Sequence, residues 1–275
     1  MTVIRTIVHP TDFSEASTEA FAHALRIALA EKSTLFLLHV AEAGDDSEWT
    51  GFPHVRATLA RWGLTDENAP VDAVGRLGIR VAKLSLTQHV TVNAILHFLA
   101  GHSADLIVLA TEGRQGVARW LQGSVAEQLA RHAKTPTLFV PAHARGFVDP
   151  DHGDIHIRHV LIPIDHQPKP AMAVAGIMGM VHRLTGDKAE ERFLHVGRHA
   201  PQIQRHAEPG RPLAVAMRDG DVVEAIVEVA AEWPADLIGM PTAGHRGFLD
   251  VLRGSISERM LRRASCPVLT VPAFI

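Results

Sequence analysis

The sequence has little cysteine and little net charge. Its 275 residues include one cysteine, Cys266, which excludes a disulfide within the chain. Twenty-seven Lys and Arg residues stand against 30 Asp and Glu residues, for a net charge of −3. This balance does not supply the basic surface that sequence-independent contacts with nucleic-acid phosphates require. We therefore expect no nucleic-acid partner, and we interpret Cys266 as a small buried hydrophobe.

Long apolar runs are also missing. No stretch approaches the roughly 20 apolar residues of a membrane-spanning helix, and the first residues show no charged leader followed by an apolar core. We therefore expect a cytoplasmic protein with no membrane partner. The hydrophobic fraction of 47%, with 21% charged residues, is typical of a chain that buries a sizeable core.

Histidine is abundant, with 18 residues. The pairs His152/His156 and His195/His199 each have the four-residue spacing that metal ligands often show. Zinc requires three or four converging ligands, however. The first pair lies in an expected linker and the second straddles the end of an expected strand, so we predict no metal site.

The chain contains an internal repeat. Residues 104–142 align without gaps with residues 235–273, and 18 of the 39 positions are identical. The openings of the two copies also correspond, with Asp12 matching Asp165, and the second strand of each copy contains the residues LHV. Identical positions of structurally demanding types include Gly113/Gly244, Gly116/Gly247, Gly123/Gly254 and Pro136/Pro267. The sequence is thus two copies of one unit.

The copies differ in length. Equivalent residues lie 156 apart at His39 and His195 but 131 apart at Gly123 and Gly254, so the first copy is 25 residues longer between these points. A polar segment interrupted by Gly and Pro separates the copies near residues 143–156. We predict domains at 1–146 and 155–275, with a shortened crossover between the second and third strands of the latter.

Each copy alternates apolar strand-like runs with helical patterns. In the first copy we expect strands at 4–10, 34–40, 81–86, 104–110 and 135–141, and helices after the N-cap Ser14 and at 55–62, 90–101 and 123–134. This alternation predicts an α/β fold with two tandem, open, doubly wound parallel sheets of five strands. Ligands of such sheets bind beyond the carboxyl ends of the strands. The final strands, 135–141 and 266–272, are expected to be sheet edges.

The loop after the fourth strand carries the pattern that suggests a ligand. Gly113 is followed by nine residues and then by Gly123 and Ser124, and the second copy repeats the spacing with Gly244, Gly254 and Ser255. Backbone amides at a glycine-bearing loop and a helix N-terminus form a natural phosphate cradle. The same pattern also fits a tight turn with a serine N-cap and no ligand. No lysine follows the second glycine and no G-x-G-x-x-G follows the first strand, which excludes a P-loop and a dinucleotide fingerprint.

Five ordered motifs recur in the two copies: the opening HPTDFSEAS, LHV, ADLIVLA, the glycine loop and the closing PTLFVP. Together they resemble the universal stress protein family in its tandem two-domain form, over nearly the whole chain. The resemblance implies a Rossmann-like fold of the adenine-nucleotide alpha-hydrolase type, with the two copies packed as an internal pseudo-dimer. It also implies a role in the stress response, and further association into a homodimer is common in the family.

Members of one branch of this family bind ATP through a loop of the pattern G, two residues, G, nine residues, G, then Ser or Thr. They place the first-strand Asp and the LHV main chain on the adenosine, and the loop on the ribose and phosphates. The resemblance therefore implies adenine nucleotide as the ligand, as ATP with or without Mg²⁺. The binding residues carried over are Pro10, Thr11, Asp12, Val40, Ala110, Gly113, Arg114, Gly123, Ser124, Val125, Asp165, Gly244, Gly254 and Ser255.

The sequence departs from that pattern at the first loop glycine. Ala110 replaces it in the first copy and Pro241 in the second. Alanine adds one methyl group, whereas proline fixes φ and removes an N–H donor. We therefore expect the first copy to hold the better nucleotide site.

Three functions remain as hypotheses. The leading one is a nucleotide-dependent regulator, and the alternative is a scaffold without nucleotide that acts through dimerisation and partner binding. An adenylyl-transferring ligase is disfavoured because no HxGH-type or SGG-type motif follows the first strand. His9 and Glu112 are interpreted as polar residues at the rim of the site, so we predict no catalytic residue and at most slow ATP hydrolysis.

Overall fold

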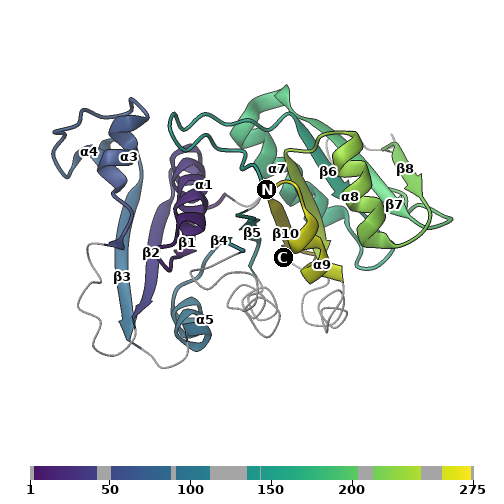
Figure 1. Ribbon diagram of the computed structural model, residues 1–275, viewed down its shortest axis with the longest axis horizontal. Coiled ribbons are helices and arrows are strands. Elements are labelled where there is room, and N and C mark those ends of the chain that lie inside the picture. The colour runs from purple at the N-terminus through teal and green to yellow at the C-terminus, as the bar shows by residue number, and fades with distance from the viewer. Residues whose placement is uncertain are drawn as a thin grey trace. The chain divides into compact units, whose positions relative to one another are not determined.

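The computed structural model describes residues 3–41, 51–87, 91–111, 135–142, 144–203, 213–242 and 256–273. The chain forms two compact units (Figure 1), which we call the N-unit, residues 3–135 and 148–155, and the C-unit, residues 136–147 and 156–275. Among the described helices, none is long and apolar enough to cross a membrane.

The sheet of the N-unit is parallel and has the strand order β3-β2-β1-β4. Its strands are β1 (Thr6–Pro10), β2 (Thr34–Ala41), β3 (Arg80–Thr87) and β4 (Leu106–Ala110). Pro10 pairs with Leu38 of β2, and Val8 pairs with Ile107 of β4. The carboxyl end of β1 therefore lies between the carboxyl ends of β2 and β4.

Helices cover both faces of this sheet. They are α1 (Glu15–Glu31), α3 (Val55–Arg61), α4 (Ala73–Arg76) and α5 (Thr91–Gly101). Ser14 caps α1 by accepting a hydrogen bond from the Ser17 N–H, as the sequence predicts. Val8 packs with Phe98 of α5, whereas the neighbouring His9 faces Phe21 of α1. Because successive side chains of a strand point to opposite faces, α1 and α5 cover opposite sides, and the prediction of a doubly wound sheet is confirmed.

The C-unit repeats this arrangement. Its strand order is β5-β10-β9-β6-β7-β8, with β5 (Thr137–Val140), β6 (His159–Pro163), β7 (Glu190–Val196), β8 (Val215–Arg218), β9 (Leu237–Thr242) and β10 (Val268–Pro272). The helices are α7 (Ala171–Thr185), α8 (Val222–Glu232) and α9 (Ile256–Arg263), with a short 3₁₀ turn at Gly186–Lys188. Helix α7 packs closely on β9, where a Cβ at Gly239 would lie 2.6 Å from Ile177.

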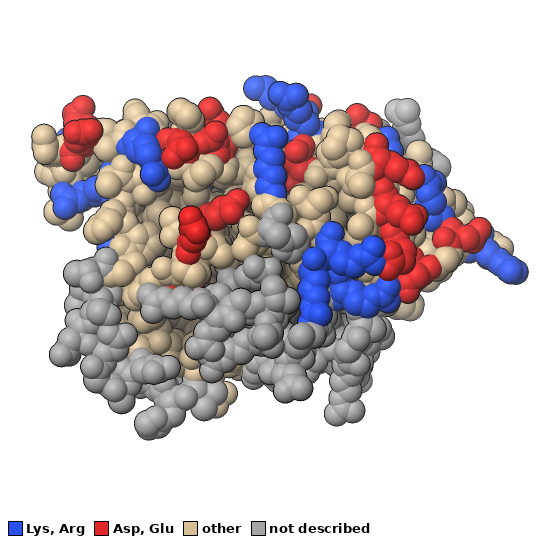
Figure 2. All heavy atoms as spheres, viewed as in Figure 1, with Lys and Arg blue, Asp and Glu red and all other residues tan. Residues whose placement is uncertain are grey.

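Ion pairs join helices α8 and α9 of the C-unit. Asp221 caps α8 and lies 2.9 Å from Arg259 of α9, and Glu224 pairs with both Arg259 and Arg263. Figure 2 shows the basic side chains over α9 next to a row of acidic side chains over α8. Arg259 and Arg263 thus link α9 to α8.

The final strands of the two copies pair with each other. β5 runs antiparallel to β10, with Phe139 opposite Val268 and Leu138 opposite Leu269. Every residue of β5 is buried. The expectation that these strands form sheet edges was wrong, because each provides the main-chain partner of the other. This pairing also explains why β5, which closes the first copy in sequence, belongs to the C-unit.

The segment between the copies is a turn that packs on the N-unit. Val148 and Ile155 form an isolated antiparallel bridge. The Trp62 indole N–H donates to the Pro150 carbonyl at 3.0 Å, and the Arg26 Nε–H donates to the Gly153 carbonyl at 2.7 Å. A Cβ at Gly153 would lie 2.5 Å from the Trp62 ring, and Gly153 has φ +73°, so glycine is required there.

Cys266 is 2% exposed. Burial raises the pKa of its thiol to about 12, and a thiol that stays protonated is a poor nucleophile. The interpretation of Cys266 as a buried hydrophobe agrees with this environment.

One carboxylate in each copy binds the start of the first strand. Asp105 Oδ2 accepts from the main-chain N–H groups of Arg5 and Thr6 at 2.8 and 3.0 Å. In the C-unit, Asp236 accepts from residues 158 and 159 at 2.7 and 3.0 Å. The aspartate of the repeated ADLI segment thus has the same structural role in both copies.

Replacing Asp105 with alanine is expected to lower the free energy of unfolding by about 1–2 kcal/mol, because two N–H donors lose a charged acceptor. Urea denaturation monitored by circular dichroism measures this change. Asp151→Ala is the control, since the Asp151 side chain is 71% exposed and its ion pair with Arg61 is long, at 3.9 Å, so its loss should change stability little. An equal effect of the two substitutions would contradict the assignment.

Candidate functional site

The turn after β1 is held by hydrogen bonds at the predicted nucleotide edge of the N-unit. The Thr11 N–H donates to Leu38 O at 2.9 Å, and the Ser17 hydroxyl donates to Thr11 Oγ1 at 3.0 Å. Asp12 Oδ1 accepts from the Ser14 N–H at 3.1 Å and from the Ser14 hydroxyl at 2.6 Å. The Asp12 carboxylate, which is partly exposed, is therefore fixed at the carboxyl end of β1.

The main chain of Val40 extends past the end of β1. The last pair between the two strands is Pro10 with Leu38, and β2 continues to Ala41. The Leu38 carbonyl points toward β1, because it accepts from Thr11 N–H. Main-chain groups of alternate residues in a strand point the same way, so the N–H and C=O of Val40 also point to this side. After Pro10 the chain leaves β1 and turns toward α1, so the main-chain groups of Val40 lie beyond the last β1–β2 pair and face the carboxyl end of β1.

His39 has a structural role that the sequence analysis missed. Its Nδ1 lies 2.8 Å from the Thr11 carbonyl, and because a carbonyl can only accept, Nδ1 carries the proton. His195 makes the same contact in the C-unit, with Nδ1 3.0 Å from the Ile164 carbonyl. The repeated LHV was the available signal: its histidine ties the second strand to the turn after the first.

Phe13, His39 and Phe52 form an aromatic group at the strand end that carries Val40. The Phe13 ring stacks on His39, with centroids 4.0 Å apart, and meets Phe52 edge-on at 5.1 Å. Phe13 has φ +63°, a left-handed conformation that costs an ordinary residue roughly 1–2 kcal/mol. A Cβ at Gly51 would lie 2.5 Å from the Phe13 ring. The absence of a side chain at Gly51 therefore gives Phe13 room to cover His39.

His9 lies in the core under α1 rather than at a rim. It is 0% exposed, and its Nδ1 lies 2.8 Å from the Val108 carbonyl. Burial lowers its pKa to about 4. His9 is therefore neutral at pH 7 and is not placed to exchange protons with a ligand.

The structure describes six of the predicted binding residues. Pro10, Thr11, Asp12, Val40 and Ala110 lie at the adjacent carboxyl ends of β1, β2 and β4, whereas Asp165 lies at the corresponding edge of the C-unit. Eight predicted residues, and Glu112, lie outside the described residues: Gly113, Arg114, Gly123, Ser124, Val125, Gly244, Gly254 and Ser255.

The C-unit repeats the main-chain geometry of this edge. The Ile164 N–H donates to Leu194 O at 2.8 Å, and the last pair of β6 with β7 is Pro163 with Leu194. Val196 is thus the counterpart of Val40. The side chains differ, because His166 stands where the N-unit has Phe13.

A cavity of about 850 Å³ lies elsewhere in the N-unit, beside α3, α4 and β3. Its lining includes Arg56, Asp72, Ile79 and Lys83 and none of the predicted nucleotide-binding residues. Burial, and secondarily Arg56, lower the pKa of Lys83. This cavity belongs to the longer crossover of the first copy and is separate from the predicted site.

A sequence profile of the universal stress protein family matches residues 4–141 and 159–272. The chain belongs to the universal stress protein family. The two matched segments correspond to the two copies of the repeat, so this member has the tandem form. The resemblance derived from the five recurring motifs is therefore confirmed.

Individual relatives agree with this assignment. A universal stress protein of Methanocaldococcus jannaschii is 32% identical over 144 residues, covering 49% of this chain and 80% of the relative. One from Mycobacterium tuberculosis is 23% identical over 274 residues, covering 86% of both chains. The crystal structure of a universal stress protein from Archaeoglobus fulgidus has a TM-score of 0.63 at 18% identity, covering 97% of this chain and 96% of that chain. This last likeness shows the tandem Rossmann-like fold.

Proposed function

We propose that this universal stress protein binds adenine nucleotide in the N-unit and acts in the stress response as a nucleotide-dependent regulator. The observation that carries the proposal is the position of the Val40 main chain. Its N–H and C=O point beyond the last pairing of β1 with β2. A donor and an acceptor side by side suit the Watson–Crick edge of adenine, whose N1 accepts and whose N6 amino group donates.

The neighbouring groups support the same ligand. The fixed Asp12 carboxylate can accept from a hydroxyl or amino group of the nucleoside, and Ala110 brings β4 to the same edge with only a methyl group. The glycine loop that follows β4 in sequence would supply the phosphate contacts that the family pattern implies. Mg²⁺ would be held mainly by the phosphates, because Asp12 Oδ1 already accepts from Ser14.

The geometry also bears on the scaffold alternative. That alternative relied on association through the final strands, but β5 and β10 pair with each other within the chain. No described residue of the site suggests an attacking group, since His9 is buried and neutral. We therefore retain nucleotide binding as the proposed activity and propose at most slow hydrolysis.

Gly123→Val is expected to weaken ATP binding by about 100-fold or more, or roughly 2.7 kcal/mol, because a branched side chain would hold the phosphates away from the main chain. Calorimetry of nucleotide-stripped protein with ATP and Mg²⁺ measures the change. Gly254→Val, the matched substitution in the second copy, should leave this first site intact. If the unaltered protein gave no heat of binding with ATP, the proposal would be wrong. Equal affinity for ATP and GTP would contradict the role given to the Val40 main chain.

A further inference from the structure

The C-unit carries a group of potential metal ligands where the N-unit has its aromatic group. Asp165 and His195 correspond to Asp12 and His39, but His166 replaces Phe13. The Ser14 position is occupied by Gln167, so the serine hydroxyl that binds Asp12 has no counterpart. The second copy thus presents two imidazoles and a carboxylate at one edge of its sheet.

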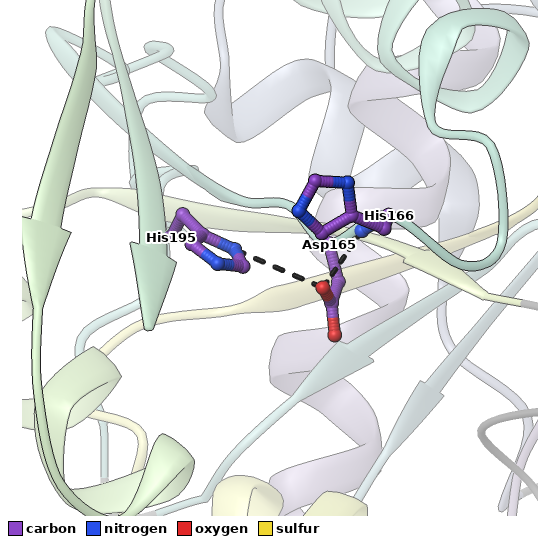
Figure 3. A group of neighbouring side chains, drawn as sticks. All are labelled: Asp165, His166 and His195. Atoms are coloured by element: carbon purple, nitrogen blue, oxygen red, sulfur yellow. Dashed lines mark hydrogen bonds and ion pairs between the residues drawn. The ribbon is translucent and has the colours of Figure 1, made fainter. Parts of the chain in front are cut away.

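These side chains lie close together. One ligand atom from each of Asp165, His166 and His195 can be chosen so that all lie within 4.8 Å of one another. His195 Nδ1 is 3.8 Å from Asp165 Oδ1, and the two imidazole rings meet edge-on at 5.5 Å. Figure 3 shows the Asp165 carboxylate facing His195 and the main-chain nitrogen of His166, to which it is hydrogen bonded at 2.7 Å.

Each imidazole has one nitrogen fixed by a main-chain carbonyl. His195 Nδ1 lies 3.0 Å from Ile164 O, and His166 Nε2 lies 2.8 Å from His199 O. Because a carbonyl can only accept, these nitrogens carry the protons, and the lone pairs are on His195 Nε2 and His166 Nδ1. A hydrogen bond from the second ring nitrogen to a carbonyl is the usual arrangement around metal-binding histidines.

Gly197 leaves space beside the lone pair of His195. A Cβ at this position would lie 2.8 Å from His195 Nε2, and Gly197 has φ +149°. The first copy has Ala41 at the corresponding position. Glycine therefore keeps the buried His195 ring, whose side chain is 6% exposed, open on its Nε2 side.

We propose that Asp165, His166 and His195 bind a divalent transition-metal ion of the zinc class. Two imidazole nitrogens and one carboxylate oxygen, with a further position for water, are a known ligand set for such ions. Bond lengths near 2.1 Å place ligand atoms roughly 3.3 Å apart around the metal. Asp165 lies beside the protonated His195 Nδ1, so metal binding requires the exposed side chains of Asp165 and His166 to move to the Nε2 side of His195, where Gly197 leaves space. The proposal does not depend on nucleotide binding in the N-unit.

The test is calorimetric titration of Zn²⁺ into the EDTA-treated, dialysed full chain. We expect one strong site per chain, tighter than any Zn²⁺ binding elsewhere, that His166→Phe, which places the residue of the first copy there, weakens by at least about 10–100-fold. Asp165→Asn should weaken it similarly while leaving the fold intact. The control is His182→Phe, because His182 lies 3.1 Å from Asp187 and is a histidine–carboxylate pair outside the cluster; it should not change the affinity.

Cobalt provides an independent readout. Co²⁺ bound to two imidazoles and a carboxylate in a four-coordinate site should give a visible absorption band that Zn²⁺ removes. The band should be lost in His166→Phe protein whose circular dichroism matches that of the unaltered chain. With 18 histidines present, some Zn²⁺ binding elsewhere is expected. Binding unchanged by both His166→Phe and Asp165→Asn, or the absence of a single strong site, would overturn the proposal.

Discussion

Phe139→Ala is expected to lower the free energy of unfolding by about 4 kcal/mol. Phe139 is 0% exposed and lies in β5, whose residues are buried throughout. Truncation removes most of an aromatic side chain from a close-packed interior and leaves a cavity. Because β5 pairs with β10 of the C-unit, the lost packing should reduce the stability of the C-unit, although Phe139 belongs to the first copy in sequence.

Urea denaturation followed by circular dichroism measures this effect. Met172→Ala is the control, because Met172 is 63% exposed and exposed substitutions usually change stability by less than about 0.5 kcal/mol. A loss below about 1 kcal/mol for Phe139→Ala would mean that β5 does not contribute to the core as described.

Acid is expected to destabilise the protein strongly between pH 7 and pH 5. Two histidines of the N-unit, His9 and His23, are 0% exposed, and burial lowers the pKa of each from 6.5 to about 4. His23 Nδ1 lies 2.9 Å from Glu19 O, and its Nε2 accepts from the Val148 N–H at 3.3 Å. Protonation of Nε2 would replace this acceptor with a second donor.

The direction of the pH dependence follows from the pKa of each histidine in the folded and in the unfolded chain. The folded pKa lies below the unfolded one, so between about pH 6.5 and pH 4 the unfolded chain binds more protons. The stabilisation is complete above pH 6.5 and is lost as the pH falls through this window. At 1.4 kcal/mol per pKa unit, each histidine contributes about 2 kcal/mol of destabilisation at pH 5, and the pair about 4 kcal/mol.

Denaturation curves at pH 7, 6 and 5 test this expectation. A His9→Gln/His23→Gln variant should be less stable at pH 7 but should show a flatter dependence on pH. His152→Gln is the control, since the His152 side chain is 72% exposed, and it should leave the slope unchanged. Equal stability of the unaltered protein at pH 7 and pH 5 would show that these histidines are already protonated or hydrated in the folded state.

Local sequence patterns predicted most elements of the fold. The continuously apolar run at 34–40 became β2, the helix at 55–62 became α3, and Ser14 caps α1 as expected. These predictions succeeded because apolar periodicity and capping depend on residues close in sequence. The predicted domain limits, 1–146 and 155–275, remain a prediction. The helix expected at 123–134 lies outside the described residues.

The candidate site was predicted only in part. The sequence placed Asp12 and Val40 at one edge, because the carboxyl ends of parallel strands meet there. It did not show that His39 binds the Thr11 carbonyl, that Phe13 covers His39, or that His9 turns into the core. Those contacts depend on which face each side chain takes in the finished sheet, and a local pattern at a strand end does not define that.

By itself the sequence determined that this protein is a tandem repeat of one α/β unit, because matched glycines, prolines and strand motifs at constant spacing specify the same local structure twice. Only the tertiary structure decided that β5 pairs with β10 and that Asp165, His166 and His195 converge. Both outcomes join residues far apart in the chain. Such contacts follow from how buried strands and helices pack together, and packing is a property of the whole fold.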